Sequence, residues 1–287
     1  DARAYASSAY DGLNRRVVVF GGNSGGFEGH RNDTWTWNGR SWHRAGPGTR
    51  PSERLGAGMA FDAGRGHVLL FGGVSPQDTV LGDTWAWDGA TWTELFPPTS
   101  PPARAFPAMA YDNVRDEIVL FGGTAVFGPE FADTWTWNGV TWVERSTPTR
   151  PPARQSAGMA FDAPRAEVVL FGGQNFPNYF SDTWVWDGAT WSERFPPDHP
   201  GDRANFGMDY DSGLGRVVVF GGNPGSQAFL NDTWMWNGAS WTRLRTATSP
   251  PPRAGLVMSY DRTRGEMVMF GGTSSTEFLG DTWTLQG

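Results

Sequence analysis

The stretch Ile118-Val-Leu-Phe-Gly-Gly123, followed ten residues later by Asp133-Thr-Trp-Thr-Trp-Asn-Gly139, holds the pattern that decides the fold. Its Phe-Gly-Gly part recurs at intervals of 51, 50, 50, 49 and 50 residues, beginning at Phe20, Phe71, Phe121, Phe171, Phe220 and Phe270. Its Asp-Thr-Trp part keeps the same step, beginning at Asp33, Asp83, Asp133, Asp182, Asp232 and Asp281. A fixed internal period of this length is typical of repeat architectures, so we expect a fold built from six similar units.

Each unit predicts four short β-strands, which we call A to D in chain order. In the third unit, strand A runs from Arg104 to Asp112, and strand B is the apolar run that ends at Phe121. Strand C begins at Asp133, and an Asn-Gly turn leads to strand D, which begins at Trp142. The Gly pair after strand B predicts a bulge or a close approach of two backbones.

Four strands repeated about every 50 residues predict an all-β fold, a six-bladed β-propeller with one blade per unit. We expect one domain over residues 1–287, with blades near residues 1–50, 51–100, 101–150, 151–199, 200–249 and 250–287. The sixth unit ends at Trp283-Thr-Leu-Gln-Gly287, and Leu285 stands where the other units have a Trp. We therefore expect blade six to lack its outer strand, and residues encoded just upstream of Asp1 to supply it.

The repeat resembles a known family. The Gly pair, the Asn-Asp-Thr-Trp segment, a Trp about seven residues further on and the Pro-x-x-Arg junction are together similar to the kelch repeat, over nearly all 287 residues. The resemblance implies blades around a shared axis with strands A to D running outward, and a role as an interaction platform. It also implies that one terminus often donates a strand to the blade formed by the other.

Composition excludes several classes of protein. The chain has no Cys, which excludes disulfides, thiolate metal sites and cysteine nucleophiles. A net charge of -7 without a basic stripe argues against nucleic acid and anionic lipid, and no apolar run approaches the ~18 to 20 residues of a membrane span. The four His occupy unrelated repeat positions, so no metal and no other cofactor is predicted. A monomer is expected. The absence of Lys, with abundant Ala, Gly and Pro, favours a GC-rich bacterial genome. A secreted or cell-surface protein is expected.

Side chains that recur in every unit are explained first by the scaffold. All 16 Trp occupy repeat positions, so we expect them to pack within or between blades rather than bind sugars. The Arg that opens each unit is expected to hydrogen-bond loop carbonyls where blades meet. Phe131 and Phe180 are expected to anchor their loops, whereas Arg31, at the same repeat position, is expected to point outward.

Function is expected where the units differ, and they differ most in the connections from strand B to strand C. These connections and the D to A crossings emerge on one face of the disc, which we call the loop face. Asp209 is unusual because the other units have Ala or Ser at its position on the innermost strand, so its carboxylate should face channel water or a polar partner. The candidate ligand-binding residues are Tyr5, Phe27, Arg31, Phe106, Phe127, Glu130, Phe176, Tyr179, Asn205, Asp209, Phe229 and Phe278.

Three functions fit these observations. The first is a binding module that presents the loop face to a protein, a peptide or a glycan. The second is an enzyme with mutarotase-like carbohydrate chemistry at the channel mouth, where Asp209, Glu130 or Arg31 would act as acid or base. No residue pair demands catalysis, so no catalytic residue is assigned and the chain is expected not to be an enzyme. The third is a structural repeat domain or an engineered scaffold without a ligand.

Overall fold

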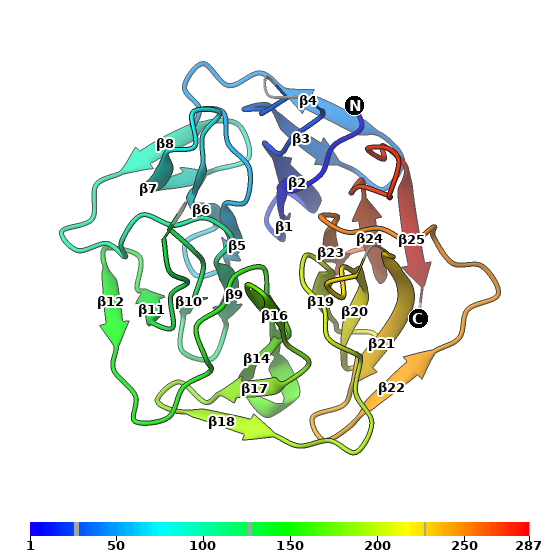
Figure 1. Ribbon diagram of the computed structural model, residues 1–287. Coiled ribbons are helices and arrows are strands. Elements are labelled where there is room, and N and C mark those ends of the chain that lie inside the picture. Colours follow the sequence, from blue (N-terminus) through cyan, green and yellow to red (C-terminus); the bar gives the residue numbers. More distant parts are fainter. Residues whose placement is uncertain (26–28, 126–127, 227, 287) are drawn as a thin grey trace.

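The computed structural model describes residues 1–25, 29–125, 128–226 and 228–286. Six antiparallel sheets surround a central channel, one sheet for each unit of the repeat (Figure 1). Sheets one to five each have four strands and the sixth has three, and the strands follow chain order from the channel outward. The six-bladed propeller and the incomplete sixth blade are therefore confirmed.

The strands keep the predicted order in every blade. The A strands lie innermost: β1 (Ser7–Asp11), β5 (Gly58–Asp62), β9 (Ala108–Asp112), β13 (Gly158–Asp162), β19 (Gly207–Asp211) and β23 (Val257–Asp261). The B strands are β2 (Arg16–Phe20), β6 (His67–Val74), β10 (Glu117–Phe121), β14 (Glu167–Phe171), β20 (Arg216–Gly222) and β24 (Glu266–Phe270). The C strands are β3 (Thr34–Trp37), β7 (Val80–Trp87), β11 (Thr134–Trp137), β17 (Thr183–Trp186), β21 (Leu230–Trp236) and β25 (Thr282–Gln286). The D strands are β4 (Trp42–Ala45), β8 (Trp92–Leu95), β12 (Trp142–Arg145), β18 (Trp191–Arg194) and β22 (Trp241–Leu244).

Two short elements lie outside this scheme. The hairpin β15 (Gln174–Asn175) and β16 (Asn178–Tyr179) stands in the B to C connection of blade four, and a 3₁₀ turn covers Ala163–Arg165. Within the described ranges, no helix is long and apolar enough to cross a membrane.

The Gly pair after each B strand joins neighbouring blades. Gly21 and Gly22 have φ of +70° and +89°, which glycine adopts without the steric cost of a Cβ. A Cβ on Gly21 would lie 2.6 Å from the carbonyl oxygen of Arg54 in the next blade. The backbone N–H of Gly22 donates to that same oxygen at 2.9 Å. The predicted close approach is thus confirmed, and it occurs between two blades.

The Arg that opens each unit forms a buried network within its blade. Arg104 donates to the carbonyl oxygen of Gly122 at 2.9 Å, as expected. It also forms a bidentate ion pair with Asp133, at 2.6 and 2.7 Å, which the sequence analysis did not foresee. Equivalent pairs link Arg3 to Asp33, Arg54 to Asp83, Arg154 to Asp182, Arg203 to Asp232 and Arg253 to Asp281.

Other groups complete this network. The indole N–H of Trp135 donates to Asp133 at 2.7 Å. Burial alone would raise the pKa of Asp133, but its bonds with Arg104 and Trp135 and the charge of Arg104 outweigh burial and hold that pKa below its ordinary value. The ring of Phe131 lies 4.1 Å from the Arg104 guanidinium, and Phe180 lies 4.1 Å from that of Arg154, which confirms both rings as loop anchors.

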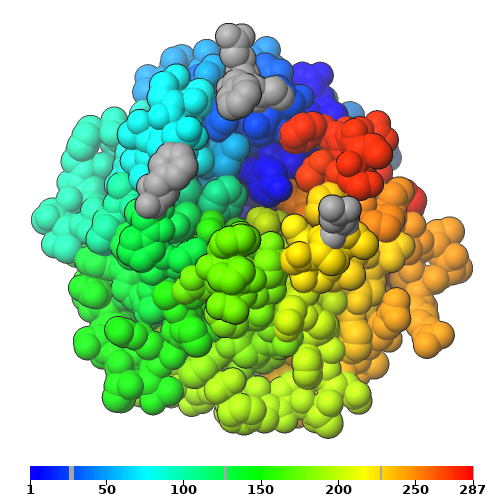
Figure 2. All heavy atoms as spheres, in the orientation of Figure 1, coloured from blue at the N-terminus to red at the C-terminus, as the bar shows by residue number. Residues whose placement is uncertain are grey.

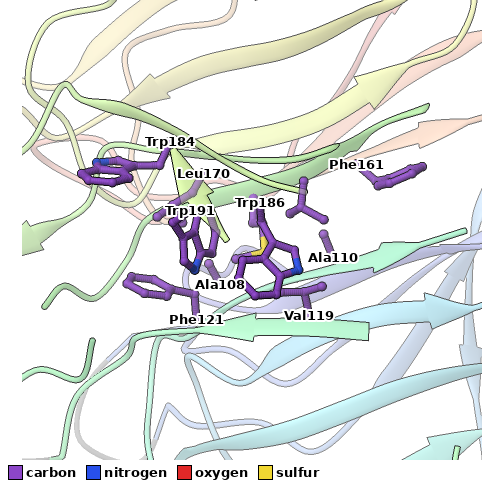
Figure 3. Close-up of a cluster of buried hydrophobic side chains, with 11 residues drawn as sticks. Ala108, Ala110, Val119, Phe121, Phe161, Leu170, Trp184, Trp186 and Trp191 are labelled. Carbon is purple, nitrogen blue, oxygen red and sulfur yellow. The ribbon is translucent and has the colours of Figure 1, made fainter. Parts of the chain in front are cut away.

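The D-strand Trp of each complete blade packs across a blade border. Figure 3 shows one such border, where Trp186 and Trp191 of blade four lie with Phe121 of blade three. The Trp191 and Phe121 rings are 5.4 Å apart, and the Trp191 indole donates to the Thr134 hydroxyl at 2.9 Å. All 16 Trp lie in the described part of the chain and none is exposed, so their predicted structural role is confirmed.

Candidate binding site at the channel mouth

A closed ring of backbone hydrogen bonds surrounds the channel on the loop face. Its members lie two residues past each opening Arg: Tyr5, Gly56, Phe106, Ser156, Asn205 and Gly255, all with φ between +55° and +64°. Each N–H donates to the carbonyl oxygen of its counterpart in the preceding blade, at 2.6 to 3.1 Å. The bond from Tyr5 to Gly255 closes the circle between blades one and six. The ring thus fixes four side chains and two glycines around the mouth of the channel.

Aromatic side chains occupy one part of this mouth. Tyr5 and Phe106 make an edge-to-face contact, with ring centroids 6.0 Å apart and an interplanar angle of 85°. The Phe106 ring covers Gly56, where a Cβ would lie 2.6 Å from it, and the Tyr5 ring covers Gly255 in the same way, at 2.9 Å. The glycines of blades two and six therefore leave space for the two rings. The side chains of Tyr5 and Phe106 form one aromatic surface.

Tyr179 comes from the B to C connection of blade four. It lies at the end of the β15–β16 hairpin, in register with Gln174, and its ring packs on Gly225 of blade five. Burial, and after it the nearby Tyr179 phenol, raises the pKa of Tyr5 above its ordinary value. Tyr5 and Phe106 are therefore in contact at the mouth, and Tyr179 of blade four packs on blade five.

Polar groups stand on the rest of the mouth. Ser156 and predicted Asn205 line the same cavity as Tyr5 and Phe106, which has a volume of about 150 Å³. All four side chains are half-buried, so each still presents atoms to solvent. Figure 2 shows the loop face, with the dark blue atoms of the N-terminal segment at its centre. The mouth is thus a shallow surface that combines aromatic and polar side chains.

The remaining predicted residues are more scattered. Arg31 is exposed, as expected, and donates to Ser24 at 2.8 Å, whereas Glu130 is half-buried and accepts from the Gln155 amide at 3.4 Å. Phe176 is 79 % exposed, and Phe229 and Phe278 are half-buried. Phe27 and Phe127 lie outside the described residues.

Asp209 lies toward the opposite end of the channel. It lines a cavity of about 130 Å³ with Arg262 and with the ring of aromatic residues that stand one position before the end of each A strand. Its two oxygens accept the backbone N–H groups of Tyr210 at 2.7 Å and of Tyr260 in blade six at 2.8 Å. Burial raises its pKa, and these two N–H groups offset part of that shift. Its expected polar partners are therefore backbone groups, and the structure does not bring it together with Glu130 or Arg31.

A ring of methionines separates the two ends of the channel. Ser8 occupies its position in blade one, and a cavity of about 180 Å³ lies inside the ring at Met59, Met109, Met159, Met208 and Met258. The sequence analysis missed this ring, although five Met at one repeat position could have revealed it. Among the described residues, no group of three or more His, Asp or Glu side chains could hold a metal ion.

These features define a class of protein: a six-bladed propeller with a ring-closed channel and one variable, aromatic face. A family model described as the KLHDC2/KLHL20/DRC7 Kelch-repeats domain matches residues 5–196, well over half of the chain. The chain therefore belongs to the kelch-repeat family, whose propellers generally bind proteins. A search of curated proteins found no match to this chain.

Proposed function

We propose that this propeller binds a protein partner through the channel mouth on its loop face. The observation that carries the proposal is the edge-to-face pair of Tyr5 and Phe106, which blades one and three bring together at the mouth. Rigid aromatic groups of this kind dominate the energy of protein interfaces, especially where polar groups surround them. An apolar or aromatic side chain of the partner would pack against this surface, beside Ser156 and Asn205.

Acidic side chains in the B to C connections of the loop face indicate the complementary chemistry of the partner. Asp78 and Glu277 are exposed in the B to C connections of blades two and six, and Glu130 is half-buried in that of blade three. Complementary charge guides encounter and orientation more than it adds affinity. We therefore expect a partner segment with basic residues flanking an apolar one.

A selection from a displayed peptide library against the immobilised propeller tests this proposal. Selected peptides should be rich in apolar and basic residues and should bind at least about tenfold more weakly to the variants Tyr5→Gly and Phe106→Gly. Glycine is the matched replacement because the chain carries it at this ring position in blades two and six, with the same backbone conformation.

Two controls distinguish the site from other surfaces. Ser156→Gly alters the same ring without removing an aromatic side chain, and Leu13→Ser changes an exposed apolar residue in an A to B turn on the opposite face. Neither should weaken binding as much as Phe106→Gly. Peptides that bind all variants equally would contradict the proposed location. A glycan array on which sugars, but no peptides, depend on Phe106 would contradict the proposed class of partner.

A further inference from the structure

The A to B turns and the C to D turns emerge on the face of the disc opposite the loop face, which we call the turn face. At one position of the A to B turn, four units carry an Arg that packs on the C to D turn glycine of the next blade. The four pairs are Arg65 on Gly139, Arg115 on Gly188, Arg165 on Gly238 and Arg264 on Gly39. These arginines therefore belong to the scaffold, and any other positive charge on this face needs a separate explanation.

Three further arginines of the turn face are not explained by the repeat. Arg15 and Arg262 lie in the A to B turns of blades one and six, and Arg40 lies in the C to D turn of blade one. At these positions the other units carry Gly, Ala, Asn, Ser, Val or Asp, and none has a basic residue. All three side chains are exposed, and they form no ion pair with any described residue.

The fold brings these arginines to the border between blades six and one. Arg264 of blade six lies against the glycine that precedes Arg40 of blade one. The Tyr10 hydroxyl of blade one donates to the Thr263 hydroxyl at 2.7 Å and accepts the Thr263 N–H at 3.2 Å, which fixes the turn that holds Arg262. Arg262 also lines the end of the channel beside Tyr10. Turns of both blades thus present exposed arginines at one border.

The border between blades two and three shows how a carboxylate fits at such a place. Asp116 stands there at the repeat position of Arg15, with φ of +57° against +55°, so both side chains leave the backbone in the same direction. The Asp116 carboxylate accepts from Arg65 at 3.2 and 3.3 Å and from the Tyr111 hydroxyl at 2.6 Å. An acidic side chain therefore joins the arginine of one blade to the tyrosine of the next.

The border between blades six and one has the same donors but lacks the acid at this position. Arg264 and Tyr10 are the counterparts of the arginine and the tyrosine just described, and Arg15 replaces the acid. Among the described residues, the Arg264 guanidinium donates to Asp261 alone. The Arg264 side chain is 34 % exposed, so an anion from solvent can reach it beside Arg15.

The local charge at this border is opposite to the charge of the whole chain. The chain has a net charge of -7. The carboxylates of the turns at this border, Asp11, Asp261 and Glu266, are however at most 7 % exposed, whereas the arginines are exposed. Charges more than about 8 Å apart are largely screened at physiological ionic strength. A ligand at the border therefore interacts mainly with the arginines beside it.

A short acidic segment of a protein suits this surface better than a nucleic acid. Arginine pairs with carboxylates through two parallel hydrogen bonds. A nucleic acid carries phosphates along its whole length and would extend beyond the two basic blades. It would then meet Asp88, Asp116 and Asp187, which are exposed on the turn face of blades two to four. The positive surface is thus matched to a ligand only a few residues long.

We propose that the turn face at the border between blades six and one binds a carboxylate-rich segment of a second protein. One carboxylate of the segment takes the place that the Asp116 carboxylate has between blades two and three, where it accepts from Arg264 and pairs with Arg15. Further acidic residues of the segment pair with Arg40 and Arg262. This site lies on the face opposite the channel mouth, and its ligand is acidic rather than basic, so the two sites do not compete.

A labelled hexaglutamate peptide tests the proposal by fluorescence anisotropy at ~0.1 M ionic strength, where distant charges are screened. It should bind the propeller saturably with a Kd below ~1 mM, and hexaglutamine should bind more weakly. Arg15→Asp should weaken binding of hexaglutamate at least about tenfold, because the new carboxylate occupies the site as Asp116 does in blade three. Arg15→Gly, which places here the residue of blades two, five and six, should weaken it severalfold. The matched control, Arg245→Asp in an exposed crossing of blade five, changes the net charge equally and should leave the Kd within about twofold.

Three outcomes would overturn the proposal. The first is absence of binding at ~1 mM hexaglutamate to a protein whose melting curve shows that it is folded. The second is an equal loss of affinity in Arg15→Asp and Arg245→Asp, which would mean that only the net charge matters. The third is tighter binding of hexathymidylate, a nucleic acid of similar charge, with the same dependence on Arg15, which would show that the class of partner is wrong.

Discussion

At the scale of single residues, each blade contains one Arg–Asp pair whose Arg is buried. Arg104 is fully buried, and Asp133, Gly122 and Phe131 all depend on its guanidinium. Such a pair is not necessarily more stabilising than two apolar residues, but removal of one partner leaves an uncompensated charge in the interior. Because the folded state lowers the pKa of Asp133, the stability that its ionised form contributes is present above the ordinary pKa of 3.8 and is lost as the pH falls.

Arg104→Ala is therefore expected to lower the free energy of unfolding by about 3 to 5 kcal/mol at neutral pH. Arg150→Ala, at an exposed residue with no ion pair in the described chain, should change it by no more than about 0.5 kcal/mol. Urea denaturation followed by tryptophan fluorescence measures both values. The cost of Arg104→Ala should shrink as the pH approaches 3.8, because protonation removes the stranded charge. Equal losses for the two variants would contradict this view of the network.

At the scale of elements, the D strands connect blades more than they extend sheets. Each D strand is only four residues long and forms the outer edge of its own blade. Its Trp nevertheless reaches into the preceding blade, where the Trp142 indole N–H, for example, donates to the Thr84 hydroxyl at 3.2 Å. The same Trp is then covered by the D strand of that preceding blade. The contribution of a D-strand Trp therefore depends on whether the neighbouring blade is complete.

Trp142 and Trp42 occupy the same repeat position and allow a direct comparison. Trp142→Ala should lower the free energy of unfolding by about 3 to 5 kcal/mol, because a ring that is 1 % exposed leaves a buried cavity. Trp42→Ala should cost less, because blade six lacks the strand that would cover its half-buried ring. Chemical denaturation of both variants measures the difference. A larger loss for Trp42→Ala would show that the open edge has no effect on the packing of blade one.

At the scale of the whole molecule, the circle is closed mainly on its inner side. The backbone ring at the channel mouth is complete, and two side-chain bonds flank blade six on the A strands. Asp209 of blade five accepts the Tyr260 N–H, and the Ser259 hydroxyl lies 3.0 Å from that of Ser8 in blade one. On the outer part of the border between blades five and six, no indole of the described residues reaches the Thr233 hydroxyl, which lines a cavity of about 160 Å³. Opening of the disc is therefore expected to begin at the rim of blade six.

Hydrogen exchange should detect this uneven closure. Amides of β25 should exchange faster than those of β11 and β17, which are covered by a D strand on their outer side. Mass spectrometry of exchanged peptides measures the difference, and β24 provides an internal reference within blade six. Uniform protection of β11, β17 and β25 would show that the open edge does not weaken the sheet.

The sequence by itself determined the features that repeat within one unit. A period of about 50 residues, alternating side chains and Gly-rich turns predict four strands, six blades and a sixth blade without its outer strand. The same comparison of units separated Phe131 and Phe180 from the candidate site residues, and it identified the ring position of Tyr5, Phe106 and Asn205. These inferences succeed because each depends on the local residue pattern and on strand alternation, and both can be recognised in the sequence itself.

Only the tertiary structure decided which of these side chains meet. Strand alternation assigns a residue to a face but does not say which residue of another blade it touches. The contact of Tyr5 with Phe106 spans 101 positions of the sequence and requires glycine at Gly56 beneath the second ring. Likewise, at five blade borders a D-strand Trp donates to a Thr of the preceding blade. Only comparison with these borders shows that no such Trp among the described residues reaches Thr233 between blades five and six. Contacts of this kind arise from the closure of the circle, which places residues of different units side by side.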